Sequence, residues 1–197
     1  VSAPPNLAVP CQGAQGTPVG LGSGSATDAC DGALAVTNDA PALFPVGTTV
    51  VTWTATDASG NVGTATQQVT VADVLSPSIE APANLQVECT SQQGTAVSLG
   101  SPVVVDDCTA VPTVTNDAPA LFPLGTTTVT WTARDAAGNT SIALQTVVVR
   151  DTTPPAIAPP TDVVVECRSP LGEVVQLVAT TSDLCDPDPS LSGDAPA

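Results

Sequence analysis

The sequence predicts an all-β protein built from tandem Ig-like β-sandwich domains that are arranged as an extended rod. The first observation behind this prediction is the composition, which is rich in Val, Thr and Ala and includes 20 Pro and 15 Gly among 197 residues. β-branched residues favour strands, and Pro and Gly favour the turns that join them. The second observation is the segment NDAPALFP, which occurs at 38–45 and again, unchanged, at 116–123.

The repeated segment belongs to a tandem array with a period of 78 residues, the step that separates Trp53 from Trp131. Cys108 and Cys185 are 77 residues apart, so the third unit is one residue shorter. Short Pro-containing segments with an acidic residue join the units and stiffen the chain there. The expected domains are 1–74, 75–152 and a partial third domain, first half only, at 153–197.

Alternation of apolar and polar residues locates the strands of each unit. In 48–57, Val51, Trp53 and Ala55 lie on one face and Thr residues lie on the other. A turn containing Gly60 follows and leads to a returning strand. In the second unit the expected strands are 85–89, 95–108, 112–117, 126–135 and 141–151. A total of roughly seven short strands per unit is typical of an Ig-like sandwich.

The core of each unit has to form with few aromatic side chains, because these make up only 2% of the residues. Trp53 and Trp131 occupy the apolar phase of a strand, which favours a core position over the alternative of a sugar-stacking platform. Domains this small, with one Trp and one Phe each, need a covalent staple.

The charge balance excludes several classes of partner. The formal net charge is −16, with 19 acidic residues against three Arg and with no Lys or His. Such a chain repels nucleic acid and anionic membrane surfaces and attracts multivalent cations. The commonest general base and Schiff-base chemistry are both missing, so we expect that the protein is not an enzyme.

Several motifs resemble those of the hyalin repeat (HYR) domain family. They are DTTPPAI (151–157), VVVEC (163–167), DDC (106–108), FPLGTTTVTWTARDAAGN (122–139) and TVVVRD (146–151). The resemblance extends over essentially the whole chain and implies tandem extracellular Ig-like modules with adhesive or architectural roles and no catalytic residues. Many family members carry four cysteines per unit, whereas this chain carries two, so the pairing of the larger set does not transfer to it.

The cysteines predict disulfide bonds. They are Cys11, Cys30, Cys89, Cys108, Cys167 and Cys185. Their even number and the absence of CxxC pairs argue against zinc and favour an oxidising, extracellular location. Because the partial third unit keeps both of its cysteines, pairing within each unit is favoured, and a bond between units is the alternative. The expected bonds, each stabilising the fold by about 3 kcal/mol, are Cys11–Cys30, Cys89–Cys108 and Cys167–Cys185.

Aspartates recur in register and are candidate metal ligands, although turn chemistry without an ion is the alternative for each of them. The candidates are Asp39, Asp57, Asp73, Asp106, Asp107, Asp117, Asp135, Asp151, Asp183 and Asp186. Stacking the units in line would bring Asp73 of one unit against Asp106 and Asp135 of the next, and Asp39 and Asp107 are expected at the same junction. Converging carboxylates repel one another unless a hard cation binds, and Ca²⁺ accepts six to eight oxygens in irregular geometry. The sequence therefore predicts calcium ions at the unit junctions.

Two functions from different classes remain open at this point. The favoured one is an extracellular structural protein, a calcium-stiffened and disulfide-stapled rod or polymeric fibre. The alternative is an adhesive stalk or accessory module of a larger secreted or cell-surface protein. The partial third domain leaves an apolar face and strand edges uncovered. We therefore expect self-association into a fibre or continuation into a longer repeat chain, with no nucleic acid and no membrane insertion.

Overall fold

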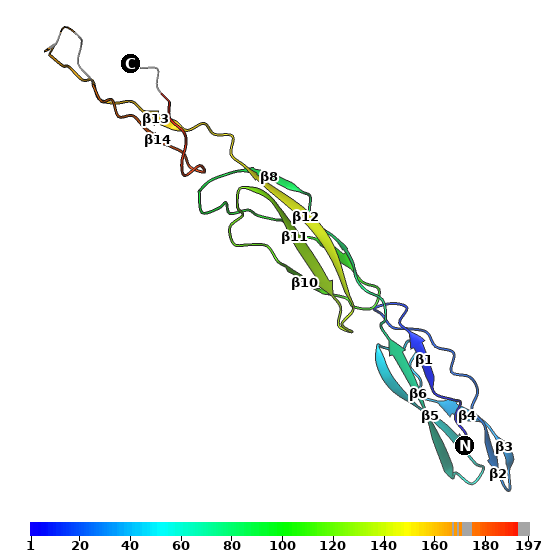
Figure 1. The fold of residues 1–197 in the computed structure, drawn as a ribbon. Coiled ribbons are helices and arrows are strands. Elements are labelled where there is room, and N and C mark those ends of the chain that lie inside the picture. Colours follow the sequence, from blue (N-terminus) through cyan, green and yellow to red (C-terminus); the bar gives the residue numbers. More distant parts are fainter. Residues whose placement is uncertain (167, 169, 171–174, 193–197) are drawn as a thin grey trace. The chain divides into compact units, whose positions relative to one another are not determined.

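The computed structural model describes residues 1–166, 168, 170 and 175–192 (Figure 1). The regular elements in these ranges are all strands, and none of the described residues forms a helix long and apolar enough to cross a bilayer. By Cα proximity the chain divides into two compact units. The first holds Val1–Glu80, Pro102–Thr115 and Trp131–Ala143, and the second holds Ala81–Ser101, Asn116–Thr130 and Leu144–Ala197.

The first repeat is built on a four-stranded sheet with the order β1-β6-β5-β4. Its strands are β1 (Leu7–Pro10), β4 (Val36–Asn38), β5 (Gly47–Thr56) and β6 (Val62–Ala72). β5 and β6 form a long antiparallel hairpin, while β1 runs parallel to β6 and pairs Leu7 with Val69. The short hairpin of β2 (Ala26–Asp28) and β3 (Gly32–Leu34) and two isolated bridges complete the repeat.

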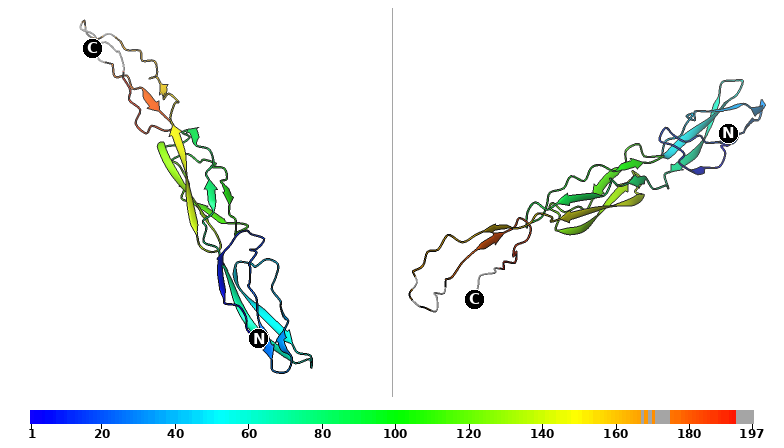
Figure 2. Two further views of the ribbon diagram at one scale, coloured as in Figure 1. Left: turned by 90° about the vertical axis from the view of Figure 1, so that its right-hand side faces the viewer. Right: turned by 90° about the horizontal axis from the view of Figure 1, so that it is seen from above.

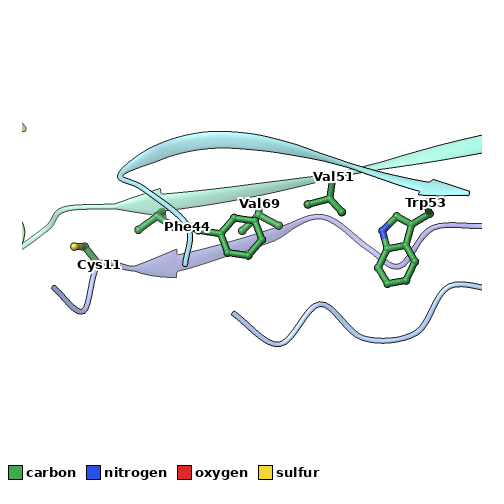
Figure 3. Packing of buried hydrophobic residues seen from close by; sticks show 6 residues of the cluster. Cys11, Phe44, Val51, Trp53 and Val69 are labelled. Carbon is green, nitrogen blue, oxygen red and sulfur yellow. The ribbon is translucent and has the colours of Figure 1, made fainter. Parts of the chain in front are cut away.

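The core of this repeat lies on the inward face of the β5–β6 hairpin. Phe44, Val51 and Val69 are each at most 1% exposed, and Trp53 is 4% exposed (Figure 3). Trp131 is equally buried in the second repeat, at 6%. The prediction that both tryptophans are core residues is confirmed. Burying a side chain of this size stabilises the fold by about 1.5–3 kcal/mol.

A buried glutamine was not anticipated. Gln67 is 0% exposed and lies in phase with the apolar residues of β6. Its amide nitrogen donates to the carbonyl oxygens of Pro5 (2.7 Å) and Leu21 (3.1 Å), and its side-chain oxygen accepts from the indole N–H of Trp53 (3.2 Å). One period later the amide nitrogen of Gln145 donates in the same way to the carbonyl oxygens of Ala83 (2.8 Å) and Leu99 (3.0 Å). The sequence does contain a signal for this buried glutamine, because Gln67 alternates in phase with the inward-facing Val69 and Val71 of the same strand.

The second repeat has a four-stranded sheet of the same kind, with the order β10-β11-β12-β8, while its two-stranded sheet differs from the β2–β3 hairpin of the first repeat. Its strands are β7 (Ser78–Glu80), β8 (Leu85–Glu88), β9 (Val103–Val105), β10 (Thr113–Asn116), β11 (Gly125–Arg134) and β12 (Thr140–Arg150). The β11–β12 hairpin appears in yellow-green in both views of Figure 2. After it, β13 (Ala156–Ala158) pairs with β14 (Thr180–Ser182). The prediction of an all-β protein with tandem β-sandwich domains is confirmed.

One expected strand is mostly absent. Segment 95–108 is extended only at Val103–Val105, and Thr95 contributes a single bridge to Phe122. Gly100 within the segment adopts a positive φ angle of 83°, which interrupts a strand, and Gly94 just before the segment has a φ angle of 119°. Each repeat consequently has six strands instead of about seven.

Candidate metal centre and disulfides

Three aspartates come together in the first compact unit. Asp73 follows β6, Asp106 follows β9 and Asp135 follows β11, so each carboxylate stands at the end of a strand. One oxygen from each carboxylate lies within 4.8 Å of the other two. Two oxygens that both sit 2.3–2.6 Å from a single Ca²⁺ can be at most about 5 Å apart. The spacing therefore fits one calcium ion.

Local turns hold two of these carboxylates in place. Asp106 Oδ1 accepts hydrogen bonds from the backbone N–H groups of Cys108 (2.8 Å) and Thr109 (2.6 Å). Asp135 Oδ1 accepts from the N–H groups of Gly138 (2.6 Å) and Asn139 (2.7 Å). These backbone bonds involve one oxygen of each residue, and the Asn139 side chain also donates to Asp135 Oδ2 (2.7 Å). A carboxylate offers about four acceptor positions, so the turns do not fill either residue. Acceptor capacity for a cation remains on both.

Asp135 is the most enclosed member, with 5% of its surface exposed. Burial raises its pKa, but hydrogen bonds from the Asn139 side chain and from the backbone of Asn139 and Gly138 outweigh this and hold the pKa below its ordinary value. The same Asn139 amide nitrogen also donates to the backbone oxygen of Asp73 (3.3 Å). Asp135 is therefore ionised at neutral pH in a confined, oxygen-rich setting.

Asp73 is connected to the turn that carries Cys108. Thr109 Oγ1 donates to Asp73 Oδ2 (3.4 Å) and accepts from the N–H of Ala136 (3.3 Å). Asp73, Cys108 and Thr109 also line a pocket of about 300 Å³. The first compact unit contains nine acidic residues and one Arg. The donor set and the charge suit a hard divalent cation, with Asp73, Asp106 and Asp135 as its ligands.

Asp39 and Asp117 are used differently. Asp39 Oδ1 accepts from the N–H of Thr52 (2.7 Å), and Asp117 Oδ1 accepts from the N–H of Thr130 (2.6 Å). Each aspartate in turn donates its own N–H to the carbonyl oxygen of the same Thr (3.3 Å). These pairs fasten the repeated NDAPALFP segment to the edge of the β5 or β11 strand.

The remaining candidates lie at turns. Asp57 accepts from the N–H and the side-chain amide of Asn61 (2.7 and 2.8 Å), repeating the Asp135 turn. Asp107 is exposed beside Asp106. Backbone hydrogen bonds from Asp186 and Cys185 lower the pKa of Asp183, and the Asp151 side chain lies beside it. Asp186 accepts from the N–H of Asp188 (2.9 Å) and Asp151 accepts from that of Thr153 (3.2 Å).

The disulfides differ from the favoured pairing. Cys11 is bonded to Cys108 and Cys89 is bonded to Cys185, with Cα–Cα distances of 6.2 Å. Cys30 is exposed and has no disulfide partner among the described residues. The predicted bonds Cys11–Cys30, Cys89–Cys108 and Cys167–Cys185 are therefore wrong, and the alternative of bonds between successive sequence repeats is correct. Cys167 itself lies outside the described residues.

The strand pairing explains why Cys11 and Cys30 cannot meet. The N–H of Cys11 donates to Ala72 at the end of β6, because β1 runs parallel to β6. Cys30 lies near the opposite end, where Asp31 accepts from the N–H of Ala58 in the β5–β6 turn. The 11 residues of β6 separate these ends, a span of about 35 Å. Disulfide geometry requires Cα atoms about 4.4–6.8 Å apart.

Tandem disulfide-bonded β-sandwiches define a class of repeat modules, and the comparison with known proteins specifies which one. The HYR domain model matches residues 3–71 and 72–149, and the chain belongs to this family as two tandem HYR domains. HYR domains are non-catalytic adhesive or structural modules, and disulfide-bonded ones are typical of extracellular proteins such as hyalin.

The relatives are much longer than this chain. It is 39% identical to hyalin of Lytechinus variegatus over 139 residues, which are 66% of this chain and 26% of that protein. It is 36% identical to hyalin of Strongylocentrotus purpuratus over 160 residues, which are 75% of this chain and 13% of that protein. Among solved structures, the extracellular cadherin domains 1–5 of protocadherin gamma B2 are 15% identical, with a TM-score of 0.37, over 92% of this chain and 46% of that chain.

Proposed function

We propose that this chain is a stretch of an extracellular structural protein whose tandem HYR domains form a calcium-stiffened, disulfide-stapled rod or polymeric fibre. One observation carries the proposal. Asp73 ends the last strand of the first repeat and meets Asp106 and Asp135 of the second, while Cys11 of the first repeat is bonded to Cys108 of the second. A covalent link and a cation site joining the same two repeats would resist bending there.

Calcium is the cation that the cluster favours. Three carboxylates within 4.8 Å of one another repel when unneutralised, and the sequence supplies no Lys or His to compensate. The backbone oxygen of Asp73 and the hydroxyl of Thr109 add further oxygen donors near the carboxylates. An irregular mixture of carboxylate, carbonyl, hydroxyl and water oxygens suits Ca²⁺ better than Mg²⁺, which demands a near-ideal octahedron.

Thermal melting with and without calcium tests the metal site. Calcium should raise the melting temperature, because a ligand at 100 times its Kd stabilises the folded state by about 2.7 kcal/mol. Asp73→Asn should abolish this rise, whereas the matched change Asp107→Asn, at an exposed neighbour of Asp106, should preserve it. A melting temperature that is the same in calcium and in chelator would overturn the calcium proposal.

The alternative, an accessory module of a larger secreted or cell-surface protein, is favoured by a different relative. The chain is 36% identical over 104 residues to the rat protein named "Sushi, von Willebrand factor type A, EGF and pentraxin domain-containing protein 1", and the match covers 50% of this chain but 3% of that protein. The stretch that resembles this chain is thus a small part of a much larger protein. Electron microscopy separates the two functions: ordered filaments support the polymer, and isolated rods support the stalk.

A further inference from the structure

The turn around Cys30 repeats the turns that carry the two bonded cysteines Cys108 and Cys185. Asp28 Oδ1 accepts from the N–H groups of Cys30 (2.7 Å) and Asp31 (3.1 Å). Asp106 does the same for Cys108 and its following residue, and Asp183 does so for Cys185 (2.7 Å). All three cysteines are therefore held by the same pair of backbone hydrogen bonds to an aspartate two residues earlier.

The surroundings of Cys30 also match those of Cys108. Asp31 Oδ2 accepts from the N–H of Ala58 (3.0 Å), as Thr109 Oγ1 accepts from the N–H of Ala136. Asp57 is bonded to Asn61 as Asp135 is bonded to Asn139. We call Asp28, Cys30, Asp31 and Asp57 the Cys30 face, and their counterparts Asp106, Cys108, Thr109 and Asp135 the Cys108 face.

The bonded counterparts show what such a face receives. Cys108 is bonded to a cysteine 97 residues earlier and Cys185 to one 96 residues earlier, each time from the preceding repeat. The same preceding repeat places an aspartate beside the face, Asp73 near Asp106 and Asp151 beside Asp183. The turns of Cys108 and Cys185 thus each receive a cysteine and an aspartate from the preceding repeat.

We propose that the Cys30 face docks the end of another HYR repeat, and that Cys30 forms a disulfide with that repeat's equivalent of Cys11. The occupant is defined by its chemistry: a cysteine thiol at the end of the strand equivalent to β1, beside an aspartate in the position of Asp73. This inference rests on the proposed function, because it extends the repeat-to-repeat linkage to a further repeat. A head-to-tail contact of this kind is open-ended and generates linear assemblies.

Bond formation proceeds by thiol–disulfide exchange with an oxidised small-molecule disulfide such as glutathione disulfide. The incoming cysteine first forms a mixed disulfide, releasing one small thiol. The Cys30 thiolate, having lost its proton to solvent, attacks the sulfur of the incoming cysteine. The Cys30 Sγ–Sγ bond forms, the bond to the small thiol breaks, and that thiol leaves with the electron pair and takes up a proton. The two protein thiols are oxidised and the small disulfide is reduced to two thiols.

A fusion protein tests the inference directly. A second copy of residues 1–78, carrying Cys30→Ser so that a single Cys30 remains, is placed ahead of Val1, which supplies the 197-residue chain with a preceding repeat in the natural 78-residue register. After oxidation in a glutathione buffer and alkylation with iodoacetamide, non-reducing peptide mapping should find Cys30 linked to residue 11 of the added copy, with loss of Cys30 alkylation. The Cys11–Cys108 bond in the same sample reports that the repeats are folded.

Cys30 that stays fully alkylated while the Cys11–Cys108 bond forms would overturn the inference. The calcium-dependent melting of the chain would be unaffected by that result, so the two proposals fail separately. The same change at Cys30 of the 197-residue part should leave the added residue 11 open to alkylation; an added residue 11 that remains disulfide-bonded would contradict the assignment. The 197-residue chain without the fusion, oxidised in the same buffer, shows where the docked repeat comes from. A covalent dimer linked through Cys30 assigns the docked repeat to a second molecule. A monomer with alkylated Cys30, together with the expected bond in the fusion protein, assigns it to the same polypeptide.

Discussion

The Cys30 face and the Cys108 face are built from the same turns yet differ in their burial. Asp135 is 5% exposed and Cys108 is half-buried, whereas Asp57 is half-buried and Cys30 is exposed. The hydrogen bonds within the two faces are nearly identical. The difference is the contribution from the preceding repeat, which covers the Cys108 face with Cys11 and Asp73. Local sequence thus prepares such a face, and a second repeat completes it.

The largest expected difference between the two faces is in stability, and it is tested by removing the Cys11–Cys108 disulfide, which the Cys30 face lacks. Cys108→Ser opens a loop of 97 residues and should destabilise the protein by about 4–5 kcal/mol, since cross-links across long loops remove much of the entropy of the unfolded chain. Cys30→Ser, at the matched position, should change stability by less than about 0.5 kcal/mol. Guanidinium unfolding midpoints measure both. Equal effects of the two substitutions would contradict the difference between the faces.

The glutamine bridges test whether the two repeats are otherwise equivalent. Gln67→Leu leaves the indole N–H of Trp53 and the carbonyl oxygens of Pro5 and Leu21 without a partner. The expected loss is about 1–3 kcal/mol, and Gln145→Leu should cost a similar amount in the second repeat.

Gln68→Leu is the matched control for this prediction, because Gln68 is the exposed neighbour of Gln67. Urea unfolding should show little change for this variant. A clearly smaller loss for Gln145→Leu than for Gln67→Leu would show that the repeats do not share one packing scheme.

Calcium sharpens the comparison between the two acidic faces. Asp135→Asn removes a carboxylate from the cluster and should eliminate the calcium-dependent rise in melting temperature. Asp57→Asn alters the matching residue of the Cys30 face and should leave that rise intact. Isothermal titration calorimetry with Ca²⁺ provides an independent measurement. Loss of calcium binding in the Asp57 variant but not in the Asp135 variant would reverse the assignment.

The smallest expected effect concerns acid, and it comes from outside both faces. The backbone hydrogen bond from Thr130 lowers the pKa of Asp117 below its ordinary value of 3.8. A lowered folded-state pKa contributes stability that is present above the unfolded pKa and is lost as the pH falls through the folded value. Stability in chelator should therefore decline below about pH 4, and Asp117→Asn should flatten the decline. An unchanged slope of unfolding midpoint against pH in this variant would contradict the prediction.

The parts of the fold that follow from local alternation could be predicted. The strand at 48–57 and its repeat at 126–135 have Val and Trp in phase, and the structure buries those side chains. The segment 95–108 was harder, because its apolar residues resemble a strand while Gly100 interrupts it. Apolar content alone does not show where the backbone leaves the extended conformation.

The disulfides could not be derived from spacing. Cys11 and Cys30 are close in sequence, but β1 pairs in parallel with β6 and carries Cys11 to the far end of the hairpin. Such non-local pairing leaves no mark in the sequence near either cysteine. The meeting of Asp73 with Asp106 and Asp135, by contrast, followed from the repeat register and the direction of the strands. The hydrogen bond between Asp39 and Thr52 could not be predicted in this way, because it depends on an edge contact that the register does not specify.

The two disulfides have a mechanical consequence, because the loops that they close overlap between Cys89 and Cys108. A pulling force applied to the two ends of the chain would pass from residue 11 to residue 108, back to residue 89, and then to residue 185. That covalent path contains only about 40 residues of backbone, so even complete unfolding would lengthen the chain to roughly 140 Å instead of the roughly 670 Å open to a reduced chain. Overlapping links therefore set an upper limit on the extension of the chain under load, which holds as long as the two disulfide bonds are intact.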